Sequence, residues 1–191
     1  MIRSVTILFA ALAIAAPAHS QSAKPAPKAA ASKTPAPKSA APKPAPAAAG
    51  PYDATNPQNL IDLLTAAGAT AAANRREADS VFVAITSAAA NFSVQFAGCN
   101  ASGRACQAVL FDGLLDVASP TLAQINGFNQ SSVVCRMYQD RAAKPHVTYA
   151  ALTMKSDTRD SGRTHLAAWQ GCLAEAATFV RDPNAYLATA P

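Results

Sequence analysis

Four cysteines are the residues of this chain whose chemistry depends most on their spacing and surroundings. Cys99 and Cys106 flank a polar, glycine-containing loop in the stretch FSVQFAGCNASGRACQAVLF, residues 92–111. The six residues between them make a wider spacing than the Cys-x-x-Cys of redox motifs or the roughly two to four residues of zinc hooks. Because each cysteine ends a strand-like run, the two would meet across a hairpin at disulfide distance. We predict a structural disulfide here, worth about 2.5 kcal/mol in the chain-entropy model.

The other two cysteines lie farther apart in the sequence. Cys135 falls in a strand-like run, 132–138, and Cys172 in an amphipathic run, 164–181, that is typical of a helix. A bridge between helix and sheet and a pair of buried free thiols are both compatible with these positions. An even number of cysteines in an exported chain favours disulfides. We therefore predict the pairing 99–106 and 135–172.

The residue types that most often carry catalysis form no motif in this chain. His146 and His165 have no second histidine or cysteine at ligand spacing, and we expect both to be exposed on the surface. The pair Asp112 and Asp116 is typical of a strand end. The sequence contains no GxSxG, HExxH, Walker or GxGxxG pattern. We predict no catalytic, cofactor or metal site and no enzyme, with a hydrolase assembled from distant residues as the alternative.

The beginning of the chain has the features of a secretory signal peptide. Arg3 supplies a basic residue, the run 5–16 is apolar, and small residues suited to a signal peptidase follow at 16–20. The apolar run is shorter than the roughly 20 residues of a spanning helix. We predict a signal peptide over 1–20 and an exported, periplasmic or secreted protein without a transmembrane segment after cleavage. An uncleaved anchor is the alternative.

Residues 21–50 have the composition of a disordered linker, with seven prolines, five lysines and no aromatic or acidic residue. The whole chain has 16 Lys and Arg against 11 Asp and Glu, a net charge of +5. Region 51–191 alone has ten basic and eleven acidic residues, a net charge of −1. The excess positive charge therefore belongs to the N-terminal part, and nucleic acid is not an expected partner. The linker is either a spacer or a weak, salt-sensitive contact to an anionic envelope surface.

Hydrophobic periodicity predicts a single α+β domain over 51–185, followed by a flexible tail over 186–191. Its antiparallel sheet of about five to six strands would pack against helices, in the order α-β-β-β-β-α-β-β-α. Asn56 and Ser119 are candidate helix caps, each followed by a proline suited to the first helical position, and Pro183 ends the last helix. The predicted helices cover 57–67, 120–130 and 164–181, and the predicted strands cover 69–74, 80–86, 91–97, 106–112, 132–138 and 146–154.

Several sequence segments of this chain resemble the YbjN family of bacterial domains, which are labelled sensory-transduction regulators. They are NFSVQFAGC, CQAVLFD, INGFNQSSVVCRMYQD and a last helix that carries Trp169 and Phe179. The resemblance covers nearly all of 55–182. It implies a fold similar to that of type III secretion chaperones, which bind other proteins and often form homodimers. The resemblance implies no active site for this chain.

The sequence therefore favours a non-enzymatic protein-interaction module, chaperone-like or regulator-like, in the bacterial cell envelope. Its partner would be a protein, or a second copy of this chain. We expect contact through an exposed sheet face or through the predicted second helix, whose candidate interaction face is Leu122, Ile125, Phe128 and Asn129. The alternative is a structural envelope protein, held by its basic linker to an anionic cell wall or membrane surface.

Overall fold

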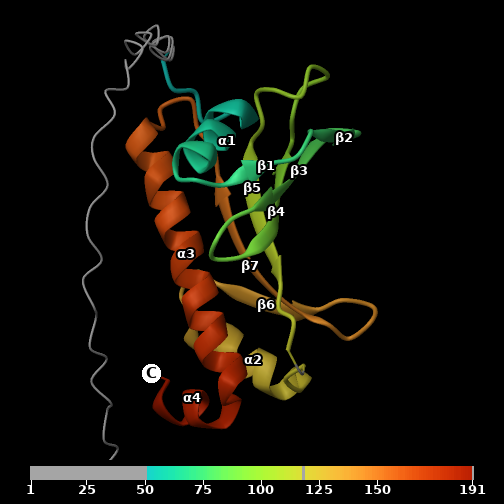
Figure 1. Ribbon diagram of the computed structural model, residues 1–191, viewed down its shortest axis with the longest axis vertical. Coiled ribbons are helices and arrows are strands. Elements are labelled where there is room, and N and C mark those ends of the chain that lie inside the picture. The colour runs from blue at the N-terminus through green and yellow to red at the C-terminus, as the bar shows by residue number, and fades with distance from the viewer. Residues whose placement is uncertain (1–50, 118, 191) are drawn as a thin grey trace, which may run out of the picture. The chain divides into compact units, whose positions relative to one another are not determined.

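An antiparallel sheet packed against helices makes up residues 51–117 and 119–190, which are the residues that the computed structural model describes (Figure 1). The predicted signal peptide and linker, 1–20 and 21–50, lie outside them. Within the described residues, the sheet has seven strands. Six of them follow the order β1-β3-β4-β5-β7-β6, and the seventh, β2, pairs with β3. The predicted α+β class is confirmed. In chain order the elements are α1 (Pro57–Ala66), β1 (Thr70–Ala71), β2 (Arg75–Glu77), β3 (Ser80–Thr86), β4 (Asn91–Ala97), β5 (Ala108–Leu114), α2 (Leu122–Ser131), β6 (Arg136–Gln139), β7 (Pro145–Leu152), α3 (Arg159–Arg181) and α4 (Pro183–Thr189).

The central strands have one buried face, and their residues alternate between that face and the opposite one. In β4, Phe92, Val94 and Phe96 are buried, whereas the side chains between them are only half-buried. The register sets Val94 between Val83 of β3 and Phe111 of β5, so one apolar row crosses three strands. This face packs against the helices. The opposite face of the sheet is called the open face below.

Helix α3 supplies most of the cover for the buried face and runs alongside the sheet in Figure 1. Trp169, which is 2% exposed, packs its ring against Phe92 and Phe111 at centroid distances of 5.3 and 5.6 Å. The helix begins at Arg159, earlier than predicted, because Thr158 caps it and Ser161 bonds back to the cap. None of the helices in the described residues is both long enough and apolar enough to cross a membrane.

Two short helices, α2 and α4, close the other end of the core (Figure 1). The predicted flexible tail from 186 is wrong over 186–189, because the chain there forms α4. Pro183 does end α3, but it also begins α4, with Asp182 accepting from the backbone N–H of Ala185 at 3.0 Å. The ring of Tyr186 then packs against Phe128 of α2.

Four predicted strands have different bounds in the structure, and one of them, 146–154, is β7 (Pro145–Leu152). The expected strand 69–74 is reduced to β1, and the charged strand β2 follows it. The expected strand 132–138 begins only at Arg136, and Cys135 lies just before it. Strand β5 starts at Ala108, two residues after the start of the predicted 106–112, because Cys106 belongs to the disulfide loop.

Candidate functional site

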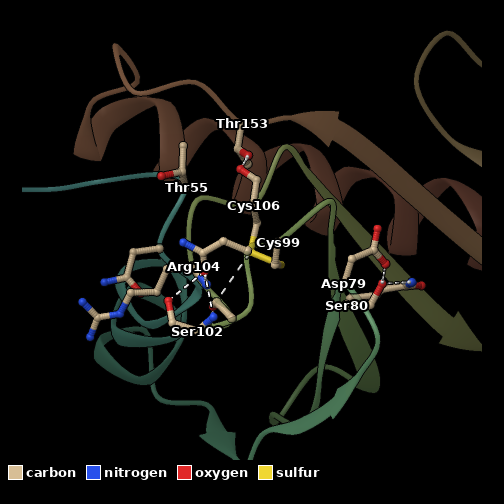
Figure 2. The surroundings of a disulfide bond; sticks show 12 residues. Thr55, Asp79, Ser80, Cys99, Ser102, Arg104, Cys106 and Thr153 are labelled. Atoms are coloured by element: carbon tan, nitrogen blue, oxygen red, sulfur yellow. Dashed lines mark hydrogen bonds between the residues drawn. A yellow bond between two sulfur atoms is a disulfide. The ribbon is translucent and has the colours of Figure 1, made fainter.

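The Cys99–Cys106 disulfide joins the end of β4 to the start of β5, as predicted (Figure 2). The loop between the two cysteines folds around Asn100. Its Oδ1 accepts hydrogen bonds from the backbone N–H and the hydroxyl of Ser102 and from the backbone N–H of Arg104, at 2.7 to 3.0 Å. The loop therefore has one compact conformation, which its own side chains maintain.

Three further hydrogen bonds attach the disulfide to neighbouring segments (Figure 2). The backbone N–H of Cys99 donates to Asp79, that of Cys106 donates to Thr55, and the Thr153 hydroxyl donates to the carbonyl of Cys106. Asp79 precedes β3, Thr55 precedes α1, and Thr153 follows β7. The disulfide thus connects four parts of the chain at one end of the sheet.

The second disulfide joins Cys135 to Cys172, also as predicted, with a Cα–Cα distance of 5.4 Å. It ties the centre of α3 to the chain entering β6, and both residues are almost completely buried. All four cysteines of the chain are paired, so none offers a thiol for catalysis or metal binding. The cysteines therefore hold the architecture together.

The predicted interaction face on α2 is largely wrong. Ile125 and Phe128 are 4% and 0% exposed, because α2 uses its apolar side for the protein's own core. Asn129 is engaged in the sheet: its amide accepts from the backbone N–H of Met137 at 2.8 Å and donates to the carbonyl of the same residue at 3.0 Å. Only Leu122, 64% exposed, faces solvent.

A hydrogen-bonded cluster of polar side chains lies on the open face, where the sequence had given no signal for a site. Asp112 of β5 accepts from the Tyr138 hydroxyl of β6 at 2.7 Å, and its other oxygen lies 2.7 Å from Nδ1 of His146 in β7. The His146 Nε2 lies 3.8 Å from a carboxylate oxygen of Asp140. The Tyr138 and His146 rings stack at 4.7 Å. We call these four residues the Asp112 cluster.

The sheet topology assembles the Asp112 cluster. Strand β7 lies between β5 and β6, although β6 comes before it in the chain. The register therefore places His146 beside Leu114 of β5 on one side and Tyr138 of β6 on the other. Sequence analysis predicted that His146 is exposed, which is wrong, because only 16% of its side chain is accessible.

Two ionisable groups of the cluster have shifted pKa values. Partial burial, together with the hydrogen bond to Asp112, raises the pKa of Tyr138 above the ordinary tyrosine value. The backbone N–H of Lys144, with that of Ala142, lowers the pKa of Asp140 by donating to its carboxylate. Tyr138 therefore remains a neutral donor, and Asp140 remains a carboxylate.

The geometry of the cluster is better suited to recognition than to catalysis. Both nitrogens of His146 face carboxylates, whereas a nucleophilic pair needs a hydroxyl or thiol against one of them. Within 51–117 and 119–190, no three His, Cys, Asp or Glu side chains are placed to hold a metal ion. His165, also expected to be exposed, is half-buried, with its Nδ1 2.8 Å from the Tyr149 hydroxyl on the other face of the sheet.

Exposed apolar side chains border the Asp112 cluster. Leu114, 48% exposed, follows Asp112 on the open face and takes part in two hollows. One, of about 430 Å³, lies over the ends of β3, β4 and β5. The other, of about 420 Å³, runs between the segment 114–117 and the last turns of α3, where Val117, Ala177 and Val180 line it. Leu114, Val117, Tyr138 and the two hollows are called the Leu114 surface below.

The two edges of the sheet differ in how they are protected from an added strand. At the β6 edge, the Asn129 amide takes both backbone groups of Met137. At the other edge, β1 and β2 share the outer side of β3. Strand addition needs free backbone donors and acceptors, so the β6 edge is protected at Met137.

These features define an α+β protein whose sheet has helices on one face and a partly apolar, hydrogen-bonded surface on the other. Comparison of the chain with protein-family models, with curated proteins and with solved structures found no match. The resemblance to the YbjN family stays a prediction.

Proposed function

We propose that this protein is a non-enzymatic protein-interaction module, chaperone-like or regulator-like, exported to the bacterial cell envelope. The observation that carries the proposal is the Leu114 surface. Leu114, Val117 and Tyr138 are 48%, 46% and 42% exposed. Leu114 and Val117 line the hollows, and Tyr138 is held beside them by its hydrogen bond to Asp112. Exposed apolar side chains that line concave surface and border polar groups are typical of protein contacts.

The Asp112 cluster gives this surface a polar side next to its apolar one. Tyr138 presents a large ring at low entropic cost, which is why tyrosine is frequent at binding hot spots. Its hydroxyl is already fixed by Asp112, so a partner would meet a pre-organised ring. We expect Leu114 and Tyr138 to contribute most of the binding free energy.

Export is supported by two disulfides, which persist in oxidising compartments, and by the signal-peptide features of the sequence. A periplasmic and a secreted location are both compatible with these observations. A homodimer formed through the same surface is one version of the proposal, in which the partner is a second copy of the chain.

Photo-crosslinking in cells tests the proposal. A photoreactive phenylalanine analogue replaces Leu114 in one variant and Thr164, an exposed residue near the start of α3, in a matched control. We expect a discrete adduct from position 114 that disappears when Tyr138→Ala is added, and no such adduct from position 164. Adduct mass separates a homodimer from a second protein. Equal adducts from both positions, or none from 114, would contradict the proposal.

A structural role for the basic linker is the second candidate, and the charge distribution favours it. Five lysines lie in 21–50, whereas 51–191 has a net charge of −1. Sedimentation with purified cell wall at low and high salt separates the two roles. If deletion of 21–50 abolishes binding to the cell wall, the linker makes the contact. If binding persists, the folded domain makes it.

A further inference from the structure

A polar hollow of about 190 Å³ lies at the opposite end of β5 from the Leu114 surface. Three separate segments form it: the beginning of α1, the chain around β2, and the loop that the Cys99–Cys106 disulfide closes. Its lining is almost entirely polar, with two guanidinium groups and three amides, and consists of Asn56, Pro57, Gln58, Asn74, Arg76, Ser102, Gly103 and Arg104.

The two arginines of this hollow are uncompensated. Neither Arg76 nor Arg104 has a carboxylate within 4.0 Å or a side-chain hydrogen bond among residues 51–117 and 119–190. The neighbouring Arg75 differs, because it pairs with Glu77 and lies over the Phe82 ring, outside the hollow. Two cations that line one hollow without a carboxylate partner favour an anionic ligand.

The disulfide loop forms one wall of the hollow. Gly103 has a positive φ of 71°, and a Cβ on it would come within 2.8 Å of the Arg76 side chain, so the guanidinium lies directly against the loop backbone. Asn100 fixes the backbone of Ser102 and Arg104. In Figure 2, Ser102 and Arg104 lie on one side of the disulfide, and Asp79 and Ser80 lie on the other. The backbone of this part of the hollow is therefore fixed before a ligand arrives.

The start of α1 contributes little besides its side chains. Pro57 has no N–H, and the N–H groups of Gln58 and Asn59 already donate to Asn56. Gln58 also donates to Asp62 at 2.8 Å, one turn farther along the helix. The guanidinium groups are therefore the main ligand-binding groups of the hollow.

We propose that this hollow binds a carboxylate that is adjacent to an amide, as at the C-terminus of a peptide or in an N-acylated amino acid. An arginine fork matches a planar carboxylate with two parallel hydrogen bonds. The amides of Asn56, Gln58 and Asn74 offer both donors and acceptors beside it. A phosphate also fits an arginine fork, but it has no amide to pair with the side-chain amides beside it, so the complete side-chain set favours the carboxylate.

A titration of the full chain, with both disulfides formed, tests this site. The probe is N-acetyl-alanyl-alanine, added to ¹⁵N-labelled protein in a buffer without phosphate. We expect saturable shifts of the Gly103 backbone N–H and of the Arg76 and Arg104 Nε–H resonances. The same peptide with an amidated C-terminus should produce none. Sodium phosphate should bind more weakly than the peptide.

Variants link the binding to these residues. Arg76→Ala and Arg104→Ala should each weaken binding about tenfold or more, as expected when a charge-assisted hydrogen bond is lost. Arg75→Ala is the matched control and should leave the affinity unchanged. The double variant C99A/C106A, which keeps the other disulfide, should weaken binding by a similar factor because the loop is no longer closed.

The proposal is overturned if the peptide produces no saturable shift, or if Arg75→Ala weakens binding as much as Arg76→Ala. Equal affinity for phosphate and peptide would contradict the carboxylate assignment. The result is independent of the proposed function, since Leu114 and Tyr138 take no part in it.

Discussion

The carboxylate of Asp112 accepts hydrogen bonds from two side chains that come from two other strands. Both donors are partly accessible to water, so water replaces part of what is lost when the carboxylate is removed. The interaction is therefore of moderate strength, and its larger effect is to fix the orientation of the Tyr138 ring. That orientation is the feature on which recognition at the Leu114 surface would depend.

Asp112→Ala should destabilise the protein by about 1–2 kcal/mol, because two hydrogen bonds to a charged acceptor are lost and water replaces part of them. The pKa of Tyr138 should fall but stay above its ordinary value, since burial is the largest cause of the increase. Urea unfolding and the ¹³Cζ shift of Tyr138 against pH measure the two effects. Asp116→Ala, at an exposed residue nearby, is the control and should change neither.

Asn129 shows how a residue can have a different role from the one its position in the sequence indicates. It was predicted to contact a partner, yet its amide satisfies both backbone groups of Met137 at the edge of the sheet. An unpaired edge strand is a template for association with another chain. Asn129 therefore protects the edge strand β6.

At the scale of elements, Asn129→Ala should expose this edge. We expect the free energy of unfolding to fall by about 1–3 kcal/mol, because two hydrogen bonds are removed and Met137 is only 3% exposed. We also expect concentration-dependent self-association through β6. Sedimentation velocity and urea unfolding measure these effects. The control is Gln130→Ala, at the next, exposed position; association of that variant to the same degree would show that the edge is not the cause.

The elements also show which parts of the fold the sequence could reveal. Strands β3 and β4 were predicted with the bounds they have, because β4 alternates between apolar and polar residues and β3 is rich in β-branched residues. Strand β2 consists of charged residues, and α4 is a short helix after a proline, so neither has a clear pattern. The start of α3 depends on a Thr–Ser capping box inside a stretch that reads as a charged loop.

The polar sites could not be predicted in the same way. The Asp112 cluster draws on three strands that become neighbours only because β7 lies between β5 and β6. The arginine hollow draws on three segments that the disulfide loop brings together. The disulfides were predictable because cysteines have few alternatives in an exported chain. Their effect on the surface was not, because it depends on side-chain packing.

At the scale of the whole molecule, the two disulfides should contribute unequally. Cys135 and Cys172 are 37 residues apart, and Cys99 and Cys106 are seven apart. The chain-entropy model then gives a stabilisation of about 4 kcal/mol for Cys135–Cys172 and about 2.5 kcal/mol for Cys99–Cys106. Urea unfolding of C135A/C172A and C99A/C106A compares them. A larger loss for C99A/C106A would mean that the contacts of the short loop outweigh loop-closure entropy.

All four tyrosines of the chain have a pKa above the ordinary value of 10.0, and burial is the first cause for each: Tyr52, Tyr138, Tyr149 and Tyr186. In the unfolded chain these phenols lose their protons near that ordinary value, whereas the native protein keeps them. Above it, the native state binds more protons than the unfolded state, so a rise in pH favours unfolding. Below it, both states are protonated and the stabilisation is complete.

The free energy of unfolding should therefore change little with tyrosine ionisation up to about pH 9 and fall steadily above about pH 10. Urea unfolding at a series of alkaline pH values measures the decrease. Tyr138→Phe should reduce its slope, because one phenol that resists ionisation in the native state is removed. Near-ultraviolet absorbance of the native protein supplies the independent check. If the tyrosines ionise together at their ordinary pKa while the fold persists, burial does not protect them and the predicted decrease has another cause.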